Sequence, residues 1–243
     1  MRIRCLGTAA CVPEAGNDSA HYLIDDGLLV DTGWNAAGNL RSLSQNAYAV
    51  HTLLLTHTHH DHILGLPGFL FDYLNAHGTL RTLTVYGPAE TNEMLARALA
   101  TLQTERFYPG CGQPVVHELS GGETLQINGL TVRTLAARHP VPALSLRIES
   151  PDGAAVGFTG DTSYFPALTD FFAGVNLLFS ECSFGAVGPE AEKQALGHMD
   201  LADAQRAAAR ASRLALVHLT QEKRRALAGA GLCLPLRGDT FSL

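Results

Sequence analysis

The densest group of side chains able to perform chemistry lies at residues 57–62, where six positions hold four histidines and one aspartate. His57 and His59 are two residues apart, so in an extended backbone their side chains project to the same side. Asp61 and His62 follow at the turn into a predicted helix, where they can point to a second metal ion. The alternative is a polar turn with chance histidines, and this density of donors argues against it.

Three further candidate ligands each follow a predicted strand: His139, Asp161 and His218. We therefore expect two metal ions, one held by His57, His59 and His139, the other by Asp61, His62 and His218, with Asp161 bridging them. Imidazole and carboxylate favour borderline divalent ions, so zinc is the expected metal, with manganese or iron as alternatives. Such a pair can share a bridging hydroxide, because the ions lower the pKa of bound water, and can stabilise the attacking and leaving oxygens of a hydrolysis.

Two β-rich halves with outer helices are predicted to position these ligands. The first half contains strands at 2–6, 20–25, 28–31, 52–55 and 83–86, and helices at 64–74 and 89–107. The second half contains strands at 115–119, 124–127, 130–136, 144–148, 154–158, 177–180 and 214–218, and helices at 164–173 and 201–213. Two sheets with helices outside suit this order better than one doubly wound sheet. No linker separates the halves, so residues 1–243 are expected to form a single domain.

The composition is that of a globular protein, with 46% hydrophobic and 16% charged residues. The formal net charge is −6 and no long basic run occurs, so a nucleic-acid partner is not expected. Five scattered cysteines argue against a disulfide framework and favour a reducing cytoplasm. There is no signal-like segment and no apolar run of membrane-spanning length, so a membrane partner is not expected either.

The order of these motifs resembles the metallo-β-lactamase superfamily. The His-x-His-x-Asp-His signature at 57–62, the isolated His139, the Gly-Asp-Thr at 160–162 and the late His218 carry the resemblance. It implies a mixed α/β fold, a four-layer αββα sandwich with the metal ions at one edge. Asp31 resembles the early aspartate of that family, which supports the ligand loop and does not bind metal; a plain turn aspartate is the alternative.

Finer features resemble the phosphodiesterase branch that includes ribonuclease Z and the cyclic-phosphate phosphodiesterases of the PhnP type. The segment 61–68 is similar to the ribonuclease Z segment after the metal motif, and Glu181 lies where ribonuclease Z has a His-Glu-Ala-Thr motif. The resemblance implies that His198 is the general acid that protonates the leaving alkoxide, with Glu181 as its orienting partner. Packing against the following helix is the alternative for His198. Asp61 completes the set of candidate catalytic residues.

One departure from ribonuclease Z narrows the substrate. The common bacterial form carries a long tRNA-gripping arm between the isolated histidine and the Gly-Asp-Thr, whereas here His139 and Asp161 are only 161 − 139 = 22 residues apart. A small or cyclic phosphodiester is therefore the expected substrate, and ribonuclease Z-like RNA processing is disfavoured. A lactone or carboxylic-ester hydrolase is the main alternative, and a metal-dependent sensor without turnover is another. The oligomeric state is left open, with a homodimer among the candidates.

Overall fold

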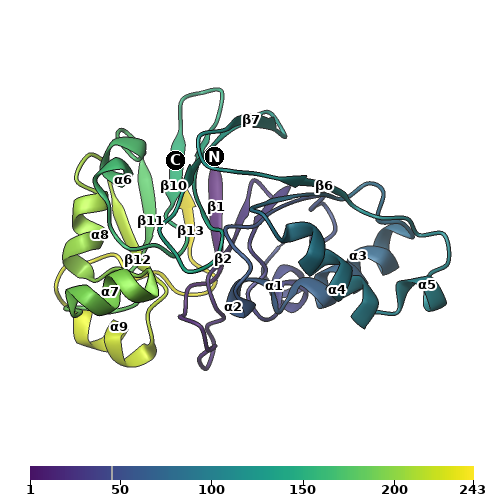
Figure 1. Ribbon diagram of the computed structural model, residues 1–243, viewed down its shortest axis with the longest axis horizontal. Helices are drawn as coiled ribbons and strands as arrows, with labels where there is room; N and C mark the ends of the chain where they lie inside the picture. The colour runs from purple at the N-terminus through teal and green to yellow at the C-terminus, as the bar shows by residue number, and fades with distance from the viewer. Residues whose placement is uncertain (45) are drawn as a thin grey trace.

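Two β-sheets pack face to face with helices on both outer sides in the computed structural model of the chain, which describes residues 1–44 and 46–243 (Figure 1). The first sheet has the strand order β13-β1-β2-β3-β4-β5-β6. Its strands are β1 Arg2–Gly7, β2 His21–Ile24, β3 Leu28–Val30, β4 Thr52–Leu54, β5 Thr84–Gly87, β6 Val115–Glu118 and β13 Thr240–Ser242.

The second sheet has the order β12-β11-β10-β9-β8-β7. Its strands are β7 Thr124–Ile127, β8 Leu130–Ala136, β9 Leu144–Glu149, β10 Ala155–Phe158, β11 Leu177–Glu181 and β12 Leu214–Val217. The two-sheet arrangement predicted from the sequence is confirmed, but β6, which was predicted with the second half, pairs in parallel with β5 in the first sheet. Strands β9 and β10 form an antiparallel hairpin.

Helices cover the outer face of each sheet (Figure 1). Beside the first sheet lie α1 Ala36–Leu43, α2 His60–Ile63, α3 Leu66–His77, α4 Thr91–Thr101 and α5 Thr104–Phe107. Beside the second lie α6 Pro166–Phe171, α7 Glu190–Leu196, α8 Leu201–Ala207 and α9 Gln221–Leu227. Within the described part of the chain, no helix combines the length and apolar character needed to cross a membrane.

The core between the sheets is built around aromatic side chains. The ring of Tyr22 lies 4.8 Å from that of Phe158 and 4.9 Å from that of Phe179, and the two phenylalanines stack at 5.3 Å. Phe241 on β13 meets Phe179 edge-on at 5.4 Å. Since β2 and β13 belong to the first sheet and β10 and β11 to the second, these rings join the two sheets.

Parallel pairing brings the ends of several strands to one edge of the sandwich. In the first sheet β3, β4 and β5 are parallel neighbours, and in the second β10, β11 and β12 are. The residues that follow the carboxyl ends of parallel strands meet at the same edge. Asp31 follows β3, His57 follows β4, Asp161 follows β10 and His218 follows β12. The sheet topology therefore gathers these residues before any contact between their side chains is considered.

Two predicted helices are shorter than expected. The segment 89–107 is divided into α4 and α5, because Gln103 has a φ of 49° and interrupts the helical backbone. The helix expected at 201–213 ends at Ala207. Beyond it, the carbonyl of Arg210 accepts the amide of Gly174 and the amide of Ser212 donates to Val175, so this segment joins the turn before β11 and leaves the helix.

We expect Phe179→Ala to lower the free energy of unfolding by about 3–5 kcal/mol, because it removes a buried ring that touches both sheets. Chemical denaturation followed by circular dichroism measures this loss. The matched control is Phe107→Ala, whose ring is 59% exposed, and which should change the free energy by less than about 0.5 kcal/mol. Equal losses in the two variants would contradict the assignment of the inter-sheet core.

Candidate metal centre

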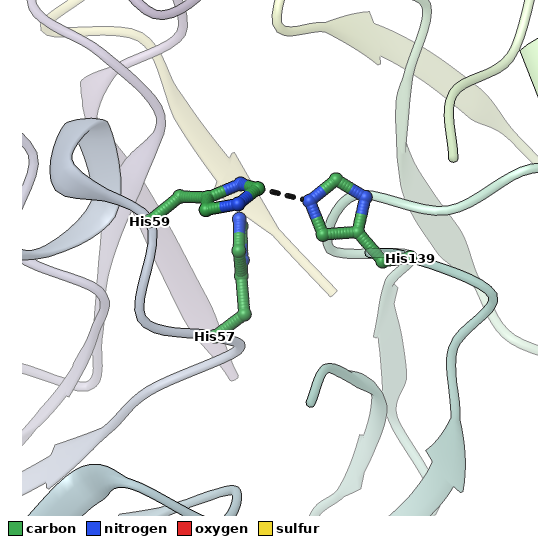
Figure 2. Close-up of side chains that lie close together, drawn as sticks. All are labelled: His57, His59 and His139. Carbon is green, nitrogen blue, oxygen red and sulfur yellow. Dashed lines mark hydrogen bonds between the residues drawn. The ribbon is translucent and has the colours of Figure 1, made fainter. Parts of the chain in front are cut away.

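The first group of candidate ligands consists of His57, His59 and His139, whose ring nitrogens lie within 4.8 Å of one another (Figure 2). His59 Nδ1 is 2.9 Å from His139 Nε2. His139 belongs to the loop between β8 and β9, and this loop reaches the ligand segment through an isolated β-bridge between Ala143 and His57. The loop that connects β8 and β9 of the second sheet thus places His139 beside the ligand segment that follows β4 of the first sheet.

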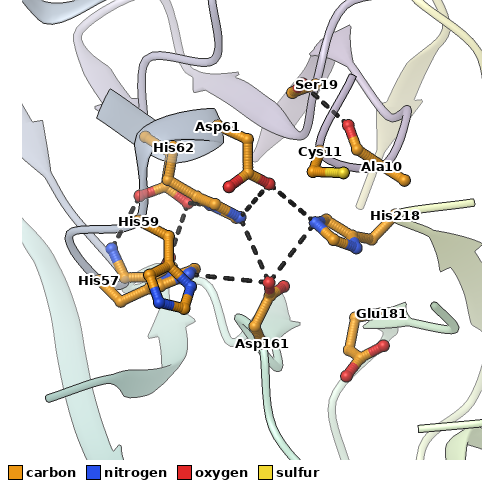
Figure 3. Close-up of polar contacts among 12 residues, drawn as sticks. Ala10, Cys11, Ser19, His57, His59, Asp61, His62, Asp161, Glu181 and His218 are labelled. Atoms are coloured by element: carbon orange, nitrogen blue, oxygen red, sulfur yellow. Dashed lines mark hydrogen bonds and ion pairs between the residues drawn. The ribbon is translucent and has the colours of Figure 1, made fainter. Parts of the chain in front are cut away.

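The second group consists of Asp61, His62, Asp161 and His218, all buried, with donor atoms again within 4.8 Å (Figure 3). Asp61 Oδ2 lies 3.0 Å from His218 Nε2 and 3.4 Å from His62 Nε2. Asp61 and His62 are adjacent residues of the short helix α2, and both face His218, which directly follows β12. Four donor atoms from three distant parts of the chain converge on one point.

Asp161 lies between the two groups (Figure 3). Its Oδ2 atom is 3.6 Å from His57 Nε2 in the first group, and 3.6 Å and 3.4 Å from His62 Nε2 and His218 Nε2 in the second. One carboxylate therefore faces both groups, as a shared ligand would.

Two buried ring nitrogens without hydrogen-bond partners in the described part of the chain indicate that the two groups can bind cations. The Nε2 atoms of His57 and His62 are buried and, among the described residues, have no hydrogen-bond partner. A buried polar atom without a partner is rare and calls for a ligand. Two ligands of one tetrahedral zinc, each bonded at about 2.0–2.1 Å, lie roughly 3.3 Å apart. The spacing of 3.4 Å between Asp161 Oδ2 and His218 Nε2 is close to that value, so the donor set fits divalent ions.

Asp31 orients one side of the centre. Its Oδ2 atom lies 2.9 Å from His62 Nδ1 and accepts the hydroxyl of Thr56 at 2.7 Å, while Oδ1 accepts the Thr56 amide at 2.7 Å. Thr56 Oγ1 in turn lies 3.1 Å from His57 Nδ1. Asp31 thus holds one ring from each group with its Nε2 atom directed inward, which is the supporting position that the resemblance implies for it.

The other side of the centre is oriented by residues that sequence reasoning missed. The backbone carbonyl of Gly197 accepts from His139 Nδ1 at 2.9 Å, and Ser183 Oγ lies 2.8 Å from His218 Nδ1. Ser183 also donates its hydroxyl to Glu181 Oε2 at 2.8 Å. A carbonyl has no sequence signature, whereas the hydroxyl of Ser183, two residues after Glu181, is a signal that could have been used.

Burial and neighbouring charges shift the histidine pKa values in opposite directions in the two groups. Burial, helped by the neighbouring His62, holds the pKa of His57 well below its ordinary value. For His62 burial acts in the same direction, but the carboxylates of Asp161 and Asp31 outweigh it and raise its pKa well above the ordinary value. A metal ligand must be a neutral imidazole, so cations bound here would displace that proton.

His198 lies at the rim of the centre, 4.0 Å from Asp161 Oδ2 at its Nδ1 atom. The same atom is 3.1 Å from Glu181 Oε1 and 3.2 Å from Ser183 Oγ. Burial acts to lower the pKa of His198, but the hydrogen bond and charge of Glu181 outweigh it and raise that pKa to about 9. His198 and Glu181 are therefore in contact, as the sequence analysis expected.

All seven predicted ligand residues meet at one edge, and both predicted catalytic partners lie beside them. His60 does not join them: its side chain is exposed and lines a groove with Pro67 and Met94, between α3 and α4. His21 is buried but belongs to neither donor group, and its Nδ1 lies 2.7 Å from the carbonyl of Ser19. His60 is thus a surface residue, and His21 is packed in the interior.

Residues 27–219 match the family described as the beta-lactamase superfamily domain, and the chain belongs to this family. An uncharacterised protein of Mycobacterium tuberculosis is 30% identical over 191 residues, which cover 76% of this chain and 68% of that protein. Ribonuclease Z of Shouchella clausii is 27% identical over 277 aligned residues, which cover 90% of this chain and 87% of that enzyme. The family predicted from the motifs is confirmed.

Solved structures show the same fold. The metallo-β-lactamase fold protein YhfI from Bacillus subtilis has a TM-score of 0.79 at 24% identity, covering 99% of both chains. The short form of human tRNase Z has a TM-score of 0.80 at 21% identity, covering 100% of this chain and 99% of that one. A diphosphatase of the PhnP family has a TM-score of 0.70 at 20% identity, covering 100% and 97%. The predicted sandwich is thus the metallo-β-lactamase fold.

We expect Asp31→Asn to weaken metal binding by about 10–100-fold, because an amide has only one accepting oxygen and cannot accept from the Thr56 amide, the Thr56 hydroxyl and His62 together. Competition with a chromophoric chelator measures the affinity. Asp170→Asn is the matched control, because that side chain is 77% exposed and distant from the centre, and it should leave the affinity unchanged. Unchanged affinity in Asp31→Asn would show that this carboxylate does not support the ligands.

Proposed function

We propose that the protein is a metal-dependent phosphodiesterase that acts on a small or cyclic phosphodiester. In this proposal His57, His59 and His139 hold one divalent ion and Asp61, His62 and His218 hold the other, with Asp161 shared between them. Membership in a superfamily of hydrolases and the two groups of convergent donor atoms support this assignment. Zinc is the proposed metal because the donors are imidazole nitrogen and carboxylate oxygen atoms, which borderline divalent ions prefer.

Bound divalent ions would supply Lewis-acid activation of water and of a phosphoryl oxygen. The chain's own residues would place the reacting groups. The Asp61 carboxylate faces His62 and His218, whose hydrogen bonds and charges outweigh the opposing effect of burial and keep its pKa below the usual range. Asp61 is therefore an anion at neutral pH, and we assign it the orientation of the attacking water as well as metal binding.

The observation that carries the phosphodiesterase assignment is the contact between His198 and Glu181 at the rim of the centre. A buried carboxylate 3.1 Å away keeps the imidazole protonated, so the ring can donate a proton. A poor leaving group such as a ribose or alkyl oxygen needs that proton when the phosphorus–oxygen bond breaks. The carboxylate of Glu181 is fixed by the amide of Met199 and by the hydroxyl of Ser183, so its geometry does not depend on solvent.

An RNA phosphodiester is the second candidate, because relatives named ribonuclease Z align with most of this chain. Against it stands the short connection between His139 and Asp161, which β9 and β10 fill as one hairpin. The formal charge of −6 also disfavours a polyanionic substrate. A small substrate remains the better supported proposal.

The experiment that tests the proposal compares rates on four substrates: bis(p-nitrophenyl) phosphate, a 2′,3′-cyclic nucleotide, a precursor tRNA and a panel of lactones. We expect hydrolysis of the first two at rates well above those on the others. Hydrolysis of lactones without any phosphodiesterase activity would overturn the proposal in favour of a carbonyl hydrolase. Cleavage of precursor tRNA as the fastest reaction would favour the second candidate.

We expect about two divalent ions per chain in the gently purified protein, and loss of both in Asp161→Ala, because that carboxylate faces both groups. Elemental analysis and circular dichroism measure metal content and folding together. The spectrum should be retained, since the core strands do not include this loop residue. An Asp161→Ala protein with full metal content and a normal rate would contradict the shared-ligand assignment.

We expect His198→Ala to lower kcat on a ribose phosphodiester by about 10²-fold or more, the usual contribution of a general acid. The loss on bis(p-nitrophenyl) phosphate should be much smaller, because p-nitrophenolate departs without a proton. Metal content should not change. Glu181→Gln should show the same leaving-group dependence in weaker form, whereas the control His77→Ala should leave both rates unchanged. Equal losses on both substrates in His198→Ala would point to a positioning role.

A further inference from the structure

An open cavity of about 410 Å³ adjoins the candidate metal centre at His139. Its volume lies within the range of about 300–1,000 Å³ that is usual for small-molecule sites. The loops after β5, β6 and β8 form its walls, among them Pro88, Leu119 and Val141. None of the residues assigned above to substrate chemistry explains this cavity, except that His139 belongs to both.

The cavity borders the metal centre at one shared residue. His139 lines the cavity, and its Nε2 atom lies 2.9 Å from His59 Nδ1. Ala143, another wall residue, forms the β-bridge with His57. A phosphate group bound between the two groups of ligands would therefore have one of its ester substituents beside these walls.

The described wall residues carry no charged side chain, and several of their hydrogen-bond donors are already used within the protein. Among the described residues that line the cavity there is no Lys, Arg, Asp or Glu. The hydroxyl of Ser120 already donates to Glu123 at 2.7 Å. The backbone amides of Leu119, Ala137 and Leu144 donate to carbonyls of the protein itself. Such walls bind an uncharged group by excluding water and would penalise a charged one.

The walls are also preformed. Pro88, Pro140 and Pro142 restrict the backbone on two sides of the cavity. Gly121 packs so closely on Ala136 that a Cβ atom there would lie 2.2 Å from the Ala136 amide nitrogen. A rigid wall loses little entropy when a ligand binds, so its apolar area contributes more fully to affinity.

The charge beside the cavity disfavours a second phosphate. Glu90 follows the wall residue Ala89, and its carboxylate accepts the hydroxyl of Thr58 at 3.2 Å, within the ligand segment. An extended polyanion reaching past His139 would meet this carboxylate without a compensating cation in the cavity walls.

From these contacts we propose that the cavity binds the non-leaving ester group of the substrate, and that this group is uncharged and apolar or aromatic. The proposal rests on the phosphodiesterase function proposed above. It makes Val141 and its neighbours in the loop between β8 and β9 determinants of specificity, separate from the residues that hold metal or donate the proton.

The test uses two substrates with a common leaving group, methyl p-nitrophenyl phosphate and phenyl p-nitrophenyl phosphate. Their kcat/KM values are compared in the wild type, in Val141→Asn and in the matched control Val187→Asn, whose side chain is 83% exposed and outside the cavity. Comparison between proteins removes the intrinsic difference in reactivity of the two substrates. Both positions lie in loops, so neither substitution interrupts a strand or helix.

We expect the wild type to prefer the phenyl ester by about tenfold or more, as burial of an aromatic ring implies. Val141→Asn should reduce that preference by about fivefold, with the methyl ester little affected, and Val187→Asn should keep it. Calorimetric binding of phenylphosphonate and methylphosphonate should show the same change in preference without turnover.

The outcomes separate the two proposals. If both diesters are hydrolysed and the preference is the same in Val141→Asn as in the wild type, the cavity assignment is overturned while the proposed function stands. If neither diester is hydrolysed, the proposed function fails and this inference fails with it. Tighter binding of an anionic substituent, measured with carboxyphenylphosphonate, would also overturn the apolar assignment.

Discussion

The burial of the Asp161 carboxylate is the constraint on which the site depends. Its Oδ2 atom lies within 4.0 Å of ring nitrogens from four histidines, three of them predicted metal ligands and the fourth His198. A buried carboxylate is tolerated only when positive or hydrogen-bonding groups surround it. Burial acts to raise its pKa, but the imidazoles of His218 and His62 outweigh that effect and hold the pKa well below the usual range. The carboxylate is therefore negatively charged at neutral pH. The surrounding strands and loops have to place histidine side chains around this charge.

Backbone strain at a supporting residue and at a predicted ligand shows how tightly this convergence is specified. Asp31 and His218 have φ values of 56° and 57°, a left-handed conformation that residues other than glycine rarely adopt. Asp31 is held there by hydrogen bonds with Thr56 and His62. His218 is held by Ser183 and by the hydrogen bond that its backbone amide donates to the carbonyl of Thr8. Hydrogen bonds at both ends of each residue offset the strain, and each side chain turns from its strand end into the centre.

The sequence was most informative about positions where the residue type itself indicates a metal ligand or a buried strand. The ligand segment 57–62 was identifiable because imidazole and carboxylate donors are rare at such density. His139 was identifiable from its place after a predicted strand and in the order of the motifs, and the strands were identifiable from apolar runs bounded by turns. Elements without such signals were missed: α1, α7 and α9 are short, and β13 has three residues. The division of segment 89–107 could not be predicted either, because it depends on the conformation of Gln103, a residue with no preference for it. Likewise, Gly197 acts through its carbonyl, which every residue carries.

One corner of the chain orients both the ring of His139, a proposed metal ligand, and His198, the proposed proton donor. The buried ammonium of Lys193 on α7 binds Asp200 at 2.9 Å and Asp203 at 2.6 Å, and the Lys193 carbonyl accepts the amide of His198. This clamp fixes the turn between α7 and α8, from which the Gly197 carbonyl holds His139.

His198 therefore approaches the centre from α7 and α8, whereas the apolar cavity opens from the loops after β5, β6 and β8. His139 lines the cavity and is also held by Gly197, which precedes His198. The cavity and His198 therefore lie on different sides of His139. Under the two proposals made above, the ester oxygen nearest His198 would receive the proton, and the other ester group would lie against the cavity walls. The arrangement of rigid elements around His139 would thus determine which phosphorus–oxygen bond breaks.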